Sequence, residues 1–226
     1  MILPLLFILS AFAAEYGPTM EGDVAVLESG GPADTGVVGC TDDLLHDGVL
    51  LPDLPLFYAR MQAPHAWGTR EMVDLLVDSA AHMHWLMPEA DPIAVGEISA
   101  PHGGALYGHK SHRGGVDADV GLFKTGGKQA QHQFDNPGAD FDVEANWAFI
   151  ATMIDSGRVD MILLDRAHIS RLRAYALRAG LLTDEEADQV FVGEDAWSKS
   201  GVIRHAPGHH DHLHVRVLCA DGSKPR

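Results

Sequence analysis

The chain has 226 residues, enough for one medium-sized domain after a short leader, and 46% of them are hydrophobic, which is ordinary for a globular core. Sixteen basic and 32 acidic residues give a formal net charge of -16. Such a charge repels the phosphates of nucleic acids and anionic lipid surfaces, so composition argues against nucleic acid as a partner.

The N-terminus, residues 1–14, is an apolar run that ends in small residues resembling a signal-peptidase cleavage site. It is too short to span a bilayer comfortably, so we expect a secretory signal peptide and no stable membrane insertion. No Lys or Arg precedes the apolar core, and the alternative is a buried N-terminal segment of a cytosolic protein. Residues 15–48 contain many Gly, Pro, Ser and Asp residues, which predicts an extended arm or linker before a domain at 49–226.

Two cysteines, Cys40 and Cys219, lie near the two ends of this mature chain. An even count after a leader is compatible with one disulfide, and closing so long a loop would add about 5 kcal/mol in the chain-entropy model. The alternative is a pair of unpaired buried thiols.

The first half of the domain predicts an extended segment, a helix and a strand. Residues 49–56 are interrupted by Pro52 and Pro55, which favours an extended or edge segment. A helix is expected over 70–87, with Thr69 as its cap and Pro88 after its end. A largely buried strand over 92–99 precedes a loop at 100–115 with five glycines, which allow backbone to approach a ligand closely.

The second half alternates strands and helices. Residues 116–123 and 211–218 alternate apolar and polar side chains, as in half-buried strands. The segment 124–141 between the first of these strands and the next helix is predicted to be a surface loop that lines a cleft. Further elements are expected at 143–156 (helix), 159–164 (strand), 167–179 (helix) and 183–190 (short helix with a capping box). The pattern predicts an α+β fold with a central antiparallel sheet that carries the site, and helices packed around it.

Two distant segments contain the residue types of a metal site. His112 lies seven residues before Asp119, with Gly114 and Gly115 between them, and His214 lies on the polar face of the last strand. Two imidazoles and a carboxylate are a donor set for one catalytic zinc ion, with the fourth position left to water. His112, Asp119 and His214 would meet if the two alternating strands were neighbours in one antiparallel sheet.

Further histidines lie near these candidate ligands. Zinc would lower the pKa of bound water to about 7, and His212, on the same strand face as His214, is the candidate base for this metal-activated water. His209 follows a Pro-Gly turn and is a candidate proton donor or oxyanion stabiliser. Asp211 is a rival base, although strand alternation places it on the core side. His109 either adds a metal ligand or lies beside the metal.

The remaining histidines are expected to have structural or solvent-exposed roles. His82 and His84 are two residues apart on a helix, which is the wrong spacing for a shared face. The same expectation applies to the isolated histidines at positions 102, 132, 168, 205 and 210.

The stretches Gly108-His109-Lys110-Ser111-His112-Arg113-Gly114-Gly115-Val116-Asp117-Ala118-Asp119-Val120 and Pro207-Gly208-His209-His210-Asp211-His212-Leu213-His214-Val215-Arg216 resemble the penicillin-insensitive murein endopeptidases. These belong to a wider group of lysostaphin, D-Ala-D-Ala peptidase and hedgehog-like zinc folds. Weaker similarity extends from about Trp67 to Leu218.

The resemblance implies a periplasmic zinc peptidase that cuts the D-alanyl to meso-diaminopimelyl bond of peptidoglycan cross-links, with stem peptides as its partner. It implies His112, Asp119 and His214 as ligands, His109 close to the metal, and His209 and His212 as the other active-site histidines. The chain has two cysteines, whereas better-known members use more disulfides.

Two alternative functions are a D,D-carboxypeptidase and a non-catalytic, zinc-stabilised wall-binding module. Related carboxypeptidases place Ser one residue further from the first His and have a Glu near the last one. Here Ser111 directly precedes His112 and the sequence around His214 has no Glu, which favours the endopeptidase. His209 and His212 argue against a structural site, which needs no spare imidazoles.

Overall fold

A computed structural model describes residue 40 and residues 43–127, 129–192 and 201–225. Within these residues the fold is α+β, and its main sheet has six strands in the order β2-β4-β5-β8-β6-β7. The strands and 3-10 helices are β1 (Val49–Leu50), β2 (Tyr58–Arg60), η1 (Ala63–His65), β3 (Trp67–Gly68), β4 (Ile93–Val95), β5 (Asp117–Gly121), η2 (Ala130–His132), η3 (Gly138–Asp140), β6 (Val159–Leu164), β7 (Ile203–His205) and β8 (His212–Val217). The α-helices are α1 (Arg70–Leu86), α2 (Val143–Asp155), α3 (Arg166–Arg178) and α4 (Asp184–Val190).

The centre of the sheet is antiparallel, as predicted. Strands β4, β5, β8 and β6 pair antiparallel, whereas the two outer pairs, β2 with β4 and β6 with β7, are parallel. Parallel neighbours need a crossover connection, and helices lie in the chain between the members of each outer pair. The sequence did not predict β2 and β7, which have three residues each and, unlike β4, are not wholly apolar.

The helices begin and end where their capping residues predict. The Thr69 hydroxyl accepts a hydrogen bond from the Met72 amide at the start of α1. Thr183 and Glu186 form both bonds of a capping box at the start of α4. Gly157 and Gly180, with φ of 70° and 68°, follow α2 and α3, and this left-handed conformation favours glycine.

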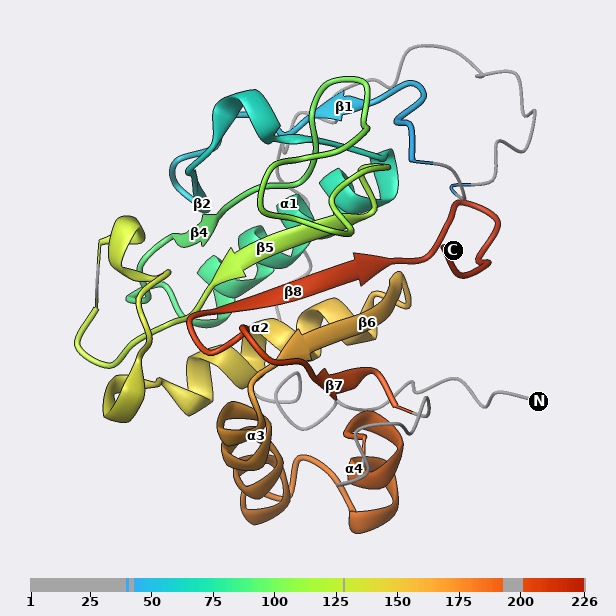
Figure 1. Ribbon diagram of the computed structural model, residues 1–226. Coiled ribbons are helices and arrows are strands. Elements are labelled where there is room, and N and C mark those ends of the chain that lie inside the picture. Colours follow the sequence, from blue (N-terminus) through green and yellow to red (C-terminus); the bar gives the residue numbers. More distant parts are fainter. Residues whose placement is uncertain (1–39, 41–42, 128, 193–200, 226) are drawn as a thin grey trace, which may run out of the picture.

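The core lies between the sheet and helices α1 and α2, which Figure 1 shows behind the strands, and it continues to α3 and α4 near the β7 edge. Leu213, Val215 and Val217 of β8 are fully buried on the core side. His212, His214 and Arg216 alternate with them and therefore lie on the opposite face. The core positions of β8 thus fix which of its side chains can form a site.

Two contacts connect the N-terminal end of the described chain to the rest of the domain. The disulfide Cys40–Cys219 is present, with a Cα–Cα distance of 5.6 Å. Leu45 is buried, and its amide donates to the carbonyl of His102, so the part of the predicted arm over 43–48 packs on the glycine-rich loop. The predicted signal peptide at 1–14 lies outside the described residues.

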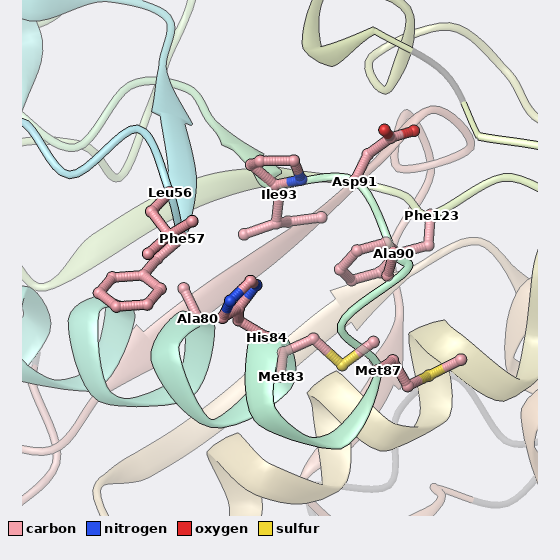
Figure 2. A pocket seen from close by; sticks show the side chains of 11 residues that line it. Leu56, Phe57, Ala80, Met83, His84, Met87, Ala90, Asp91, Ile93 and Phe123 are labelled. Atoms are coloured by element: carbon pink, nitrogen blue, oxygen red, sulfur yellow. The ribbon is translucent and has the colours of Figure 1, made fainter.

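His84, for which the sequence left packing or solvent exposure open, packs against a neighbouring ring. Its ring meets Phe57 edge-on, with centroids 5.7 Å apart. Figure 2 shows both side chains beside a mostly apolar pocket between α1 and Ile93. No helix in the described ranges combines the length and the hydropathy needed to cross a membrane.

Candidate metal centre

The two segments singled out in the sequence meet in the middle of the sheet. Strands β5 and β8 are antiparallel neighbours (Figure 1), and their register places Asp119 opposite His214 and Asp117 opposite Arg216. Asp119 and His214 are buried, and their side chains meet on the face of the sheet away from the core. The register therefore brings together residues that are 95 positions apart in sequence.

His112 reaches the same point from the loop that precedes β5. Its Nε2 atom is 3.2 Å from His214 Nδ1 and 3.2 Å from Asp119 Oδ1, and the latter two atoms are 3.0 Å apart. Zinc–nitrogen and zinc–oxygen bonds of about 2.0–2.1 Å in a tetrahedron would separate two ligand atoms by about 3.3–3.4 Å. The triangle of His112, Asp119 and His214 thus has nearly the size that one zinc ion requires.

In His112 and His214, the ring nitrogen that points away from the triangle has a hydrogen-bond partner. His112 Nδ1 donates to the carbonyl of Ile98 at 3.0 Å, and His214 Nε2 donates to Asp117 Oδ1 at 2.7 Å. Because these partners only accept hydrogen bonds, the lone pairs of the neutral rings lie on the nitrogens that face Asp119. The donor set therefore fits a divalent cation in both atom type and tautomer.

His109 lies beside this triangle. Its Nδ1 atom is 3.5 Å from Asp119 Oδ2, and the possible ligand atoms of His109, His112 and Asp119 all lie within 4.8 Å of one another. These three residues form a group that could hold a metal ion. The structure thus places His109 near the candidate site. Both roles that the sequence allowed for it, an added ligand or a residue beside the metal, remain compatible with this position.

Buried charges set the protonation of the triangle. Burial would raise the pKa of Asp119, but hydrogen bonds with His112 and His214 outweigh it and hold that pKa far below its ordinary value. Burial would lower the pKa of His214, but hydrogen bonds with Asp117 and Asp119 raise it to about 9. A metal ion would therefore compete with a proton at His214.

Asp117 has a role that sequence reasoning missed. It is fully buried, and besides its contact with His214 it accepts bonds from Arg216 Nε at 2.8 Å and Nη2 at 3.1 Å. One indication of this role was visible in the sequence, because strand alternation placed Asp117 on the same face as Asp119. The register with β8 was needed to show that Asp117 orients His214.

His212 and Asp211 form a pair at the start of β8. The His212 Nδ1 atom is 2.7 Å from Asp211 Oδ1, and its Nε2 atom is 3.7 Å from Asp119 Oδ1. The expectation that Asp211 faces the core is wrong, because β8 begins at His212 and Asp211 lies in the preceding turn. Its carboxylate orients His212 so that Nε2 points toward the candidate ligands.

His209 lies above the same face. Its ring centroid is 4.9 Å from that of His212 and 5.8 Å from that of His214. Its Nδ1 atom faces the carbonyl oxygens of Ala206 and Pro207, which leaves Nε2 as the acceptor. Burial, then the charges of His212 and His214, lower the pKa of His209, so the ring favours its neutral form.

Helix α3 holds the loop that carries His209. The amide of Asp165 donates to the carbonyl of His209 at 2.8 Å, and His168 Nε2 donates to the carbonyl of His210 at 2.9 Å. The His168 ring stacks on Phe141 with centroids 4.4 Å apart. His168 therefore has the structural role expected for it, and His132, on the surface beside Asp135, lies outside the triangle as well.

The predicted surface loop over 124–141 borders the site. Gln133 lies over Gly121, where an added Cβ would be 2.7 Å from the Gln133 Cβ, and the Phe134 ring lies in the same way over Gly96. The Phe134 centroid is 6.3 Å from that of His212. Because Gly96 and Gly121 have no side chains, this loop can pack close to the sheet beside the candidate centre.

Fold and site together define a class of protein: an α+β protein with imidazoles and a carboxylate gathered on one sheet face, a donor set that metallohydrolases use. A family comparison identifies the particular group. The profile of the penicillin-insensitive murein endopeptidases matches residues 39–225, and the chain belongs to this family. No curated protein matches the chain significantly. The family is one of peptidases that act on peptidoglycan, so the chain is a murein endopeptidase.

Proposed function

We propose that the protein is a zinc metallopeptidase that hydrolyses peptidoglycan cross-links at the D-alanyl to meso-diaminopimelyl bond. His112, Asp119 and His214 are its zinc ligands. The observation that carries the proposal is the triangle of these three side chains, with ligand atoms 3.0–3.2 Å apart. The family supplies the substrate class, and the donor set supports the metal.

Bound zinc would supply a Lewis acid that polarises the scissile carbonyl and acidifies a water molecule. His212 would accept a proton from the attacking water at Nε2, because Asp211 occupies its Nδ1 and would stabilise the imidazolium that results. His212 then donates the proton to the leaving amine of the diaminopimelyl residue. The amide bond breaks, the water oxygen becomes part of the D-alanyl carboxyl group, and the remaining proton of that group passes to the released amine, which leaves a carboxylate and an ammonium.

His209 assists His212 in the same reaction. Its neutral ring offers an acceptor at Nε2, and it becomes a donor only after it has taken a proton. We therefore assign it to holding the water or passing a proton, and to stabilising the oxyanion once it is charged. His109, whose Nδ1 is near Asp119 Oδ2, would add a ligand or lie beside the metal.

The place of action is outside the cytoplasm. The family's substrate is peptidoglycan, and a disulfide joins Cys40 to Cys219, a bond typical of oxidising compartments. We propose the periplasm as that compartment. The signal peptide at 1–14, the arm at 15–48, the peptidase domain at 49–226 and the likeness to lysostaphin and hedgehog-like folds stay predictions from the sequence.

The test uses purified protein and cross-linked muropeptide dimers with a D-alanyl to diaminopimelyl bond. Mass spectrometry should show monomers in the presence of zinc and none after chelation. His214→Ala should be inactive, whereas His132→Ala, which changes a surface imidazole, should keep full activity.

Three outcomes would contradict the proposal. Release of free D-alanine with the dimer left intact would identify a carboxypeptidase. Binding of the dimer without turnover would identify a wall-binding module. Activity that survives complete removal of metal would remove zinc from the mechanism.

A further inference from the structure

His109 lies on the glycine-rich loop between β4 and β5, and a carboxylate outside that loop holds its ring. His109 Nε2 is 2.6 Å from Glu97 Oε2, while Nδ1 is 3.5 Å from Asp119 Oδ2. Gly108, directly before it, has φ of 87°, which favours glycine and gives the backbone freedom at this point. The contact with Glu97 therefore restricts the direction of the His109 ring.

Glu97 is itself anchored to the sheet beside a candidate ligand. The Gly96 amide donates to the carbonyl of Asp119 at 2.8 Å, and the Asp119 amide donates to the carbonyl of Glu97 at 3.0 Å. These two bonds continue the pairing with β5 beyond Val95, the last residue of β4, to Gly96 and Glu97. The backbone of Glu97 is therefore placed relative to Asp119 by the sheet.

The second oxygen of Glu97 has a partner too. Its Oε1 atom is 2.7 Å from His65 Nδ1, and the His65 carbonyl accepts bonds from the amides of Ile98 and Ser99. A carboxylate held at both oxygens loses rotational freedom, which makes it a better support for His109. The Glu97 and His109 side chains are 24% and 23% exposed, so solvent weakens this contact only in part.

The contact selects one tautomer of His109. A carboxylate only accepts hydrogen bonds, so Nε2 of the neutral ring carries the proton and Nδ1 carries the lone pair. That lone pair faces the carboxylate of Asp119, an arrangement that suits a cation bound by both. Ile98, the next residue, selects the tautomer of His112 through its carbonyl. Two consecutive residues thus orient two imidazoles toward one point.

We infer that Glu97 is a positioning residue of the zinc centre, which orients His109 so that its Nδ1 faces the ligand atoms of His112 and Asp119. This inference rests on the proposed zinc function. Glu97 acts through His109, and His65 acts only by holding Glu97. The sequence did not single out Glu97 or His65, because neither lies in the two matching stretches.

The experiment measures zinc affinity by competition with a chromophoric chelator, together with the visible absorption of the Co²⁺ form as a signature of coordination. Glu97→Ala should weaken zinc binding by about 10- to 100-fold and change the Co²⁺ spectrum. Glu97→Gln should restore most of the affinity, because its amide oxygen still accepts from Nε2. His65→Ala removes only the partner of the second Glu97 oxygen and should therefore weaken zinc binding by less than about fivefold, as expected for a partly exposed contact.

A double-mutant cycle separates action through His109 from a general loss of structure. In a His109→Ala background, the further change Glu97→Ala should leave zinc affinity unaltered. An unchanged affinity in Glu97→Ala alone, or the same loss in both backgrounds, would overturn the inference. If the wild type binds zinc and cleaves dimers but the effects of the two substitutions on zinc affinity add, only the role of Glu97 is refuted. If the wild type binds no zinc, the proposed function is refuted as well.

Discussion

Replacing Asp117 with asparagine tests whether a buried carboxylate orients His214, a proposed zinc ligand. The side chain of Asp117 is completely buried and accepts bonds from His214 Nε2 and from two nitrogens of Arg216 at 2.7–3.1 Å. Asparagine keeps the shape but removes the charge, and its NH₂ group cannot accept. The variant therefore leaves a mostly buried guanidinium, 16% exposed, without its counterion.

Two losses are expected in this variant. Zinc affinity should fall about 10- to 100-fold, which is about 1.4–2.8 kcal/mol, because the outer partner of a ligand histidine is weakened. The free energy of unfolding of the metal-free protein should fall by about 3 kcal/mol. This is the lower end of the range for breaking a buried ion pair, because Arg216 keeps some contact with solvent.

The stability loss has a defined dependence on pH. Burial would raise the pKa of Asp117, but hydrogen bonds to His214 and Arg216 outweigh it and lower that pKa. A lowered pKa stabilises the fold at pH values above the unfolded value of about 4, and this contribution is lost as pH falls through the folded value. The difference between wild type and variant should therefore shrink on acidification below about pH 4.

Urea unfolding and chelator competition measure these two quantities. Asp135→Asn is the matched control, because it makes the same chemical change in an exposed carboxylate that also contacts an imidazole, His132. The control should leave zinc affinity and stability unchanged. If Asp117→Asn binds zinc as tightly as the wild type, the assignment of Asp117 as the support of His214 is refuted.

Three further predictions concern catalysis, the disulfide and a buried charge. His212→Ala should lower dimer cleavage by about 10²- to 10⁴-fold in the muropeptide assay with zinc affinity unchanged; a loss of zinc would instead identify a ligand. Cys219→Ser should lose up to about 5 kcal/mol of unfolding free energy in urea, and the reduced wild type should be as unstable as the variant; equal stability of the variant and the oxidised wild type would contradict this. Burial raises the pKa of Asp155 from 3.8 to about 6, and its Oδ1 has no partner among the described residues, so wild-type stability should fall as pH rises from about 4 to 6. The full pKa shift corresponds to about 3 kcal/mol, and partial exposure reduces the stability that Asp155→Asn should gain at pH 7 to about 1 kcal/mol. Thermal denaturation should show this gain at pH 7 and none at pH 4. A gain in stability at pH 4 would refute the charge explanation.

The sequence by itself determined the long elements and the donor types. Helices α1 and α2 have caps, stops and apolar stripes that are local signals, and β8 alternates over enough residues to show which side chains share a face. His112, Asp119 and His214 could be nominated because their chemistry is specific, and their order along the chain matches a known family.

Only the tertiary structure decided which groups support those donors. Asp117 meets His214 through the register of β5 with β8, and Glu97 meets His109 through the extension of β4 along β5. Such contacts join residues that are distant in sequence, and a register shift of one residue would turn each side chain to the other face. The candidate ligands can therefore be named from the sequence, whereas the residues that orient them come together only once the sheet has formed.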